Sequence, residues 1–421
     1  MQKWYKLDNA AKIFPAVTNK NRPYMFRVSV VLKEKIDKDT LQAALNAIIE
    51  RFTSFNVRLK KGFFWHYLET NPKKPLVFLE DSYVNKAINK KETNDFLFRT
   101  LYYENKISVE FFHSITDGKG ALTFLNALVY EYLILKGEII DPEHKIWTKD
   151  IEVRYDETVD QYVKNYNKKD LKKAKEDKAY HIKADIYKDN YQAIIHGYLK
   201  LDELRKVAQN YGVTLTEYLS GVLVYANYQY LKGKDFKKTF RLILPVNMRQ
   251  FISTKTLRNF VLYMRINYDF NQELSLEEIF SITKNGFKEE LVKDKLLSTL
   301  ASNVKFEKNI INRSVPLFIK TFFMKLVFNF VGEALNSFAF SNLGLVDLPK
   351  DMESYIDRYQ FIIGTSTDCP KAMSAISFNN TLTINFVSLM IDNDIEKHFF
   401  NTLRKDGLNV EIETNELEVS I

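Results

Sequence analysis

One short segment combines the residue types that general acid–base chemistry needs. His113 begins the hexapeptide His113-Ser114-Ile115-Thr116-Asp117-Gly118, so an imidazole is followed four residues later by a carboxylate and then by a glycine. An imidazole with a pKa of about 6.5 can take up and release a proton near neutral pH. The same residues also fit a plain turn, in which Asp117 caps the next helix and Gly118 relieves the chain reversal. The hexapeptide alone leaves both interpretations open.

The flanking segments place His113 between the end of a predicted strand and the start of a predicted helix. Residues 96–103 and 107–112 are rich in β-branched and aromatic side chains, and the three residues between them predict a hairpin that leads into His113. Residues 120–136 carry apolar side chains at helical spacing and end in Lys136 and Gly137, a cation and a glycine suited to a helix C-terminus. We expect His113 to be held between these two elements.

Strands and helices alternate along the rest of the chain, which predicts an α/β (α+β) fold. The length of 421 residues favours two domains, which we place at residues 1–150 and 189–421. Residues 151–188 are polar, and nine lysines fall between Lys164 and Lys188. We interpret this segment as a solvated, charged, helical linker, because a nucleic-acid interface would need arginines and aromatic residues on a recognisable module.

Composition restricts the compartment and the partners. The single cysteine, Cys369, rules out an intrachain disulfide and favours the cytoplasm. The start of the chain lacks the apolar core of a secretory signal, and the most apolar stretch, residues 315–335, is interrupted by Lys320 and Lys325. We therefore expect a buried or amphipathic helix there, packed in the core, with contact to lipid as the less favoured alternative. The net charge of +8 is compatible with an anionic cosubstrate.

Other reactive side chains fit chemistry less well. Ser114 adjoins His113, but adjacent strand side chains point to opposite faces, so a serine–histidine nucleophile pair is not expected. Cys369 precedes Pro370 and lacks a local reactive context. The remaining histidines show no zinc-ligand spacing, so we predict no metal; they are His66, His144, His181, His196 and His398.

Three ordered motifs resemble one known family. The His-x-x-x-Asp-Gly motif after a strand is followed by Pro245-Val246-Asn247-Met248-Arg249 with Arg258-Asn259-Phe260, and then by Ser341-Asn342-Leu343-Gly344. With the opening segment, residues 4–15, this order resembles the chloramphenicol acetyltransferase-like superfamily, and most of all its free-standing bacterial alcohol-acetyltransferase-like members. The resemblance implies two domains of one fold, each a mixed sheet with flanking helices, that form a pseudo-dimer with a channel between them.

The resemblance also implies roles for individual residues. His113 would be the catalytic base, Asp117 a structural partner of Arg249, and Gly118 the residue that permits a tight turn and a close approach of substrate. Ser341 would donate a hydrogen bond to the oxyanion of a tetrahedral intermediate. Three amides in the matching segments would bind substrate or support the site: Asn247, Asn259 and Asn342.

The activity that follows is transfer of a short acyl group from acyl-coenzyme A to an alcohol, without a covalent enzyme intermediate or a permanently bound cofactor. An amine acceptor, and a condensation-type or lipid or polyketide acyltransferase that uses an acyl carrier protein, remain alternatives. Phe112 stands where many condensation domains have a second histidine, which disfavours the carrier-protein version. We expect a monomer. The alternative outside enzymology is a non-catalytic relative that only binds an acyl ligand or a partner.

Overall fold

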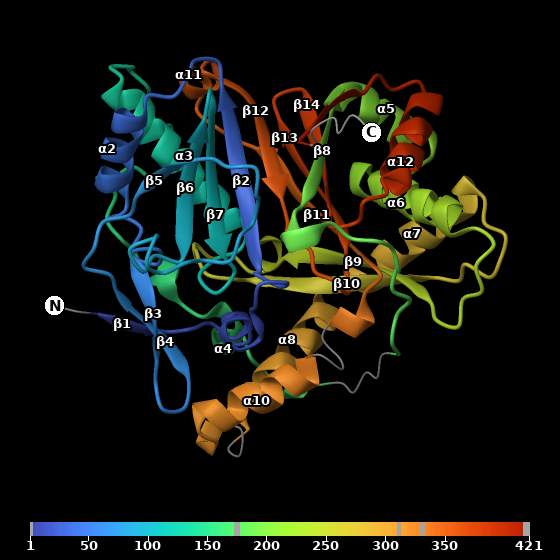
Figure 1. Ribbon diagram of the computed structural model, residues 1–421, viewed down its shortest axis with the longest axis horizontal. Helices are drawn as coiled ribbons and strands as arrows, with labels where there is room; N and C mark the ends of the chain where they lie inside the picture. Colours follow the sequence, from blue (N-terminus) through green and yellow to red (C-terminus); the bar gives the residue numbers. More distant parts are fainter. Residues whose placement is uncertain (1–2, 172–176, 310–312, 329–332, 416–421) are drawn as a thin grey trace.

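The protein was analysed as a computed structural model that describes residues 3–171, 177–309, 313–328 and 333–415 (Figure 1). Among these residues the strands form three sheets, and two of them are large. Each large sheet mixes parallel and antiparallel pairs and carries helices against it. The predicted mixed α/β architecture is therefore confirmed.

The five-stranded sheet carries the hairpin that leads into His113. Its order is β12 (Ile356–Ile362), β2 (Met25–Leu32), β7 (Lys106–Phe112), β6 (Phe98–Tyr103) and β5 (Val77–Leu79). Helices α2 (Lys38–Ile48) and α3 (Gly118–Leu135) pack on each other beside it (Figure 1). Strand β2 is buried along its whole length, because β7 and β12 flank it on both edges.

The seven-stranded sheet forms the second half. Its order is β10 (Val261–Tyr268), β9 (Phe240–Asn247), β11 (Phe338–Val346), β13 (Lys371–Phe378), β14 (Thr381–Ser388), β8 (Ala193–Lys200) and β15 (Glu411–Thr414). Its helices are α5 (Leu201–Asn210), α6 (Leu215–Leu231), α7 (Leu276–Glu290) and α12 (Asp394–Lys405). A capping box begins α6, with Thr214 and Glu217 each bonded to the other's backbone N–H.

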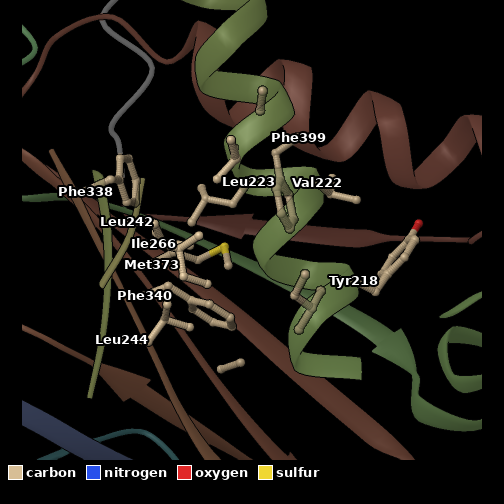
Figure 2. Packing of buried hydrophobic residues seen from close by; sticks show 14 of the residues in the cluster. Tyr218, Val222, Leu223, Leu242, Leu244, Ile266, Phe338, Phe340, Met373 and Phe399 are labelled. Atoms are coloured by element: carbon tan, nitrogen blue, oxygen red, sulfur yellow. The ribbon is translucent and has the colours of Figure 1, made fainter. Parts of the chain in front are cut away.

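The core of the second half lies between α6 and this sheet. Figure 2 shows Leu223 of α6 directed toward apolar side chains of the sheet, with Phe399 of α12 beside the helix, whereas Tyr218 projects from the opposite side of α6. The sheet residues are Leu242, Leu244, Ile266, Phe338, Phe340 and Met373. A second cluster of similar size fills the first half. Burial of this much apolar surface is the main favourable contribution to folding.

One strand from the second half of the chain joins the sheet of the first half. Strand β12 follows β11 in the chain but pairs with β2, so residues 356–362 complete the sheet of the first half. The short remaining sheet is β1 (Trp4–Lys6), β4 (His66–Thr70) and β3 (Val57–Lys61). The division into residues 1–150 and 189–421 stays a proposal, to which the structure adds this crossing strand.

The segment 151–188 differs from the predicted solvated helix. Its described part is largely irregular, with short helical turns such as α4 (Gln161–Lys164). Glu157 is buried and forms a bidentate ion pair with Arg51 of the first half, while the hydroxyl of buried Tyr162 donates to the carbonyl of Val261 at 2.7 Å. The predicted helix is therefore wrong, whereas most of the described segment is exposed or half-exposed as expected, and Glu157 and Tyr162 fasten it to both halves. Residues 172–176 lie outside the described residues.

The apolar stretch 315–335 also differs from its prediction. It contains α10 (Leu317–Val327), which lies at the lower edge of the molecule near the β3–β4 hairpin and α8 (Lys293–Lys308) (Figure 1). Its phenylalanines face outward instead of packing in the core, while Lys320 is buried. Residues 329–332 lie outside the described residues. None of the helices in the described ranges is long and apolar enough to cross a membrane.

Candidate active site

His113 follows the last residue of β7, and aromatic rings hold its imidazole. Its backbone N–H donates to the carbonyl of Tyr24 at 2.9 Å. The ring of Phe14, from the short helix α1 (Phe14–Val17), stacks on the imidazole with the centroids 5.0 Å apart. The ring of Phe26, from β2, lies 5.0 Å away in a tilted arrangement. These contacts restrict the rotation of a side chain that is half-buried.

Asn259 fixes the protonation of the imidazole. The side-chain Nδ2 of Asn259 donates to the Asp8 carboxylate at 3.1 Å and to the carbonyl of His113 at 2.9 Å. Because both of these partners are acceptors, the amide oxygen must be the atom that faces His113 Nδ1 at 3.0 Å. An amide oxygen only accepts, so Nδ1 carries the proton and Nε2 keeps a lone pair.

The charge of His113 is set by opposing effects. Burial lowers the pKa of His113 below its ordinary 6.5, while Asn259, the Asp117 carboxylate and the backbone carbonyls of His113 and Thr116 act in the other direction. The net direction is downward, so the imidazole is neutral at neutral pH. A neutral ring with a free Nε2 lone pair is the form that a general base needs.

Asp117 performs two functions at once. Its Oδ1 accepts from Gly120 N–H at 3.1 Å and caps α3. Its Oδ2 accepts from Arg249 Nη1 at 2.8 Å and from the backbone N–H of Phe260, also at 2.8 Å. The expected ion pair is therefore present, together with the helix cap that the turn interpretation predicted. Because Phe260 follows Asn259, the carboxylate also holds the backbone that presents Asn259 to His113.

Arg249 holds the loop of residues 256–260 through hydrogen bonds from its guanidinium. It lies in the single 3₁₀ turn η5 (Met248–Gln250), whose N-cap is Asn247. Its guanidinium donates to the carbonyl of Thr256, to the carbonyl of Arg258 at 2.7 Å and to Asn247 Oδ1 at 3.1 Å. Asn247 thus supports the arginine and makes no direct hydrogen bond to the imidazole. With Asp117 from the first half, these contacts fix residues 256–260 at the junction of the two halves.

Two glycines allow the close packing at the start of α3. A Cβ at Gly118 would lie 2.7 Å from the side chain of Leu343. Gly118 does not have a positive φ, so the tight turn expected of it is not the reason for glycine here. The more demanding position is Gly120, where a Cβ would lie 2.1 Å from Thr116 Oγ1 and 2.5 Å from the carbonyl of Leu257. The sequence interpretation overlooked Gly120.

Strand β11 brings the third motif to the same junction. Ser341 is 8% exposed, and its hydroxyl has no hydrogen-bond partner among the described residues. Asn342 donates to Thr216 Oγ1 at 3.1 Å and accepts from Gly344 N–H, so it anchors the strand to α6. The strand bulges between Asn342 and Leu345, where Gly344 adopts φ of +79°. Leu343, next to the bulge, is the residue that approaches Gly118.

Asp8 and Arg258 complete the site and were not identified from the sequence as site residues. Asp8 is fully buried, and it accepts from Asn259 and from the backbone N–H of Ala11. Burial raises the pKa of the Asp8 carboxyl to about 7, Asp160 adds to the rise and Arg258 opposes it. Arg258 is also buried and donates to the carbonyl of Lys6 at 3.1 Å. Hydrogen bonds therefore connect His113 to Asn259 and Asn259 to Asp8.

The residues that the sequence interpretation set aside lie in other environments. The hydroxyl of Ser114 is buried without a hydrogen-bond partner among the described residues, and it does not bond to His113. The half-buried Cys369 donates from Sγ to the carbonyl of Asn336 at 3.4 Å. His196 is buried within β8, opposite Asn385 of β14.

Comparison of the structure with solved structures gives strong matches at low sequence identity. The trichothecene 15-O-acetyltransferase of Fusarium sporotrichioides matches with a TM-score of 0.60 and 11% identity, over 96% of this chain and 95% of that chain. The wax ester synthase/diacylglycerol acyltransferase of Marinobacter aquaeolei VT8 matches with a TM-score of 0.56 and 12% identity, over 96% and 100%. These similarities extend over both halves of the molecule.

A condensation domain matches as well. A mutant of the starter condensation domain of rhizomide synthetase, in complex with C8-CoA, matches with a TM-score of 0.57 and 13% identity, over 96% of this chain and 94% of that chain. No protein-family model matches the sequence, and no curated protein is significantly similar to it. The chain therefore shares its fold with these acyltransferases and condensation domains.

Proposed function

We propose that the protein transfers an acyl group from a coenzyme A thioester to the hydroxyl of an alcohol. The observation that carries this proposal is the neutral imidazole of His113, whose Nδ1–H is directed to Asn259 and whose Nε2 keeps a lone pair. A thioester carbonyl is electrophilic enough to react with an alcohol once a base removes the hydroxyl proton. His113 is the side chain at the junction of the halves that supplies such a base.

The proposed reaction proceeds without a covalent enzyme intermediate. His113 Nε2 takes the hydroxyl proton as the alcohol oxygen bonds to the thioester carbonyl carbon. The carbonyl oxygen becomes the oxyanion of a tetrahedral intermediate. When the intermediate collapses, the carbon–sulfur bond breaks, and the imidazolium returns its proton to the departing thiolate. The products are an ester and free coenzyme A, and His113 is neutral again.

Ser341 is the proposed donor to the oxyanion. The hydroxyl is largely buried on β11 and has no hydrogen-bond partner among the described residues, so it is available to a ligand. The strand also reaches α3, because Leu343 lies against Gly118 at the start of that helix. A preorganised donor of this kind contributes roughly 2.7–4 kcal/mol to the stabilisation of a transition state.

The acyl donor is inferred from the charge of the protein and from proteins that share its fold. The net charge of +8 suits the anionic coenzyme A, and a structure that shares the fold is a complex with C8-CoA. A carrier-protein thioester is the second candidate, because several proteins with this fold are condensation domains. Phe112 disfavours it, since the position of the second histidine in many condensation domains is here a buried aromatic ring.

The test is release of free thiol from acetyl- and octanoyl-coenzyme A with a panel of alcohols and amines. We expect release that depends on an alcohol. Saturable binding of the thioester without thiol release would instead assign the chain to the non-catalytic alternative. Equal turnover with amines would shift the acceptor class and keep the role of His113.

Ser341→Ala tests the oxyanion role in the same assay. We expect turnover to fall about a hundredfold, because one oxyanion donor is lost. Ser377→Ala is the matched control, since Ser377 is a buried serine on the neighbouring strand β13. A loss of no more than about twofold at Ser341 would remove the oxyanion assignment.

A further inference from the structure

The orientation of α10 is the reverse of that of an ordinary surface helix. Phe318, Phe322 and Phe323 are 75%, 61% and 58% exposed, whereas Lys320 is only 7% exposed. Residues 318, 322 and 323 fall on one side of the helix because they are four and five positions apart. A helix at a water surface normally turns its apolar stripe inward and its cations outward. The outward stripe of α10 is therefore suited to a non-aqueous partner.

The tip of the β3–β4 hairpin has the same character. Its sequence is Lys60-Lys61-Gly62-Phe63-Phe64-Trp65, and Phe63 is 70% exposed. The backbone N–H of Leu317, at the start of α10, donates to the carbonyl of Phe63 at 2.8 Å. Lys320 Nζ donates to the carbonyl of Phe64 at 3.0 Å and lies 3.6 Å from the centre of the Trp65 ring.

These contacts fuse the helix and the hairpin tip into one surface, which Figure 1 places at the lower edge of the molecule. We name it the α10–hairpin surface and define it by Phe63, Phe64, Phe318, Phe322 and Phe323. Contiguous exposed aromatic residues of this kind are unusual on a monomer and mark an interaction site.

Exposed cations lie on both segments of this surface. Residues 313–328 contain no acidic residue, and Arg313 and Lys325 are exposed there, as is Lys61 before the hairpin tip. Lys320 is buried, and Lys60 pairs with Glu69 at 3.3 Å. The cations influence one another: burial and then the charges of Lys61 and Lys90 lower the pKa of His66 to about 4. Burial and then Lys12 lower the pKa of Lys320 to about 8. The surface is thus apolar at its centre and positively charged at its margin.

The surface also connects to the candidate active site. The ring of Phe328, directly after α10, packs edge-on against Tyr24 with the centroids 6.0 Å apart. Tyr24 contacts Phe14 at 5.3 Å, and Phe14 stacks on His113 at 5.0 Å. An unbroken series of aromatic contacts therefore leads from the end of α10 to the imidazole.

We propose that the α10–hairpin surface binds an anionic lipid membrane, with the phenylalanines inserted among the acyl chains and the exposed Lys61, Arg313 and Lys325 at the phosphate level. Aromatic side chains with flanking cations are the composition of segments that lie in a membrane interface without crossing it. None of the described helices is long and apolar enough to cross a membrane. This inference goes beyond the proposed acyl transfer and holds whatever reaction His113 performs.

A second copy of the chain fits the surface less well. In a two-fold contact the same patch appears on both partners, so the cations of one copy would face those of the other. Like charges across an interface oppose association. An anionic lipid surface instead complements the aromatic centre and the basic margin together.

The test is co-sedimentation of the full-length protein with vesicles. One set contains equal parts of phosphatidylcholine and phosphatidylglycerol, and the other contains phosphatidylcholine alone. We expect binding to the anionic set, weaker binding to the neutral set, and release by high salt. Phe322→Ser with Phe323→Ser should weaken binding to anionic vesicles by about tenfold or more.

The matched control is Ile139→Ser with Ile412→Ser. Both residues are exposed aliphatic side chains, 93% and 43%, on other elements of the molecule. The control should bind as the wild type does, and circular dichroism should show that both double variants are folded. Absence of binding, equal binding to both vesicle sets, or equal loss in the control would each contradict the proposal. If the wild type and the control were dimers and the phenylalanine double variant were a monomer, the surface would be assigned to a second copy of the chain.

Discussion

Two histidines of this protein make the same local contact in different settings. His113 Nδ1 faces Asn259 Oδ1 at 3.0 Å, and His196 Nδ1 faces Asn385 Oδ1 at 2.7 Å. His196 lies inside β8, directly across from Asn385 on β14, so the regular register of one sheet creates the pair. His113 and Asn259 instead meet at the junction of the two halves, where Asp117 and Arg249 hold the connecting loop.

The difference shows what makes one pair a candidate for catalysis. His196 is 8% exposed, and burial lowers its pKa to about 4, with Asn385 and Glu413 opposing the fall. A ring so placed can remain neutral, but it is enclosed by its own sheet. His113 is half-buried after the end of a strand, which leaves its imidazole partly open to solvent at the junction of the two halves. Assembly across a junction supplies access that a strand interior does not.

The largest expected effect separates the two histidines directly. His113→Ala should lower acyl transfer about a thousandfold, because general base catalysis contributes roughly 10²–10⁴. His196→Ala should leave turnover within about threefold and lower the urea midpoint, because it opens space inside a sheet. The assay is thiol release under saturating substrate. Equal losses of turnover in the two variants would contradict the assignment of His113, and not His196, as the catalytic base.

Next in size is the effect of the amide partners. Asn259→Ala should reduce turnover about tenfold to a hundredfold, because the imidazole loses the acceptor that holds its Nδ1–H. Asn385→Ala should affect stability alone. A change in the pH–rate profile of the Asn259 variant distinguishes a positioning role from a structural one. Unchanged turnover and an unchanged profile would remove Asn259 from the site.

Breaking the support of the junction should cost stability as well as activity. Asp117→Asn leaves the guanidinium of Arg249 without its carboxylate at a site only 11% exposed. Loss of one partner of a buried pair costs about 3 kcal/mol, measured by urea unfolding. The control is Lys35→Gln, which removes an ion pair with Glu104 that is largely exposed, and its urea midpoint should stay close to that of the wild type. Similar costs would show that the junction does not depend on the pair.

The smallest expected effects are those of pH. His196 has a folded pKa of about 4, below its ordinary 6.5, so the unfolded chain binds more protons between these values and stability falls as the pH decreases through this window. His196→Gln should lack this part of the slope. The pKa of His113 is also lowered, so activity should decline as the pH falls through a midpoint below 6.5. An activity profile that rises well above pH 6.5 would contradict a neutral His113.

Elements set by local patterns were predictable from the sequence. The β6–β7 hairpin, α3 with its Asp117 cap and the α6 capping box follow from residue spacing and are present. The end of α2 was less predictable. The apolar stripe continues through Ile49 and Phe52, which are buried, but the helix ends at Ile48. Tight turns keep these side chains in the core after the helix has stopped, so periodicity overestimates its length.

Features that need distant parts of the chain were not predictable. The hydrogen bond from Asn259 to Asp8 joins residues 251 positions apart, and no local spacing indicates it. The need for glycine at Gly120 arises from the carbonyl of Leu257, which lies in the other half. The outward face of α10 depends on Lys320 finding Trp65 and the carbonyl of Phe64. The chemistry of each residue was visible in the sequence, but its partners were not.

The most direct test of the account is the ¹⁵N spectrum of the His113 ring in histidine-labelled protein at neutral pH, assigned with His113→Gln. We predict the neutral tautomer with the proton on Nδ1 and an unprotonated Nε2, as Asn259 requires. A proton on Nε2, or a doubly protonated ring at neutral pH, would contradict the proposal that His113 is the base.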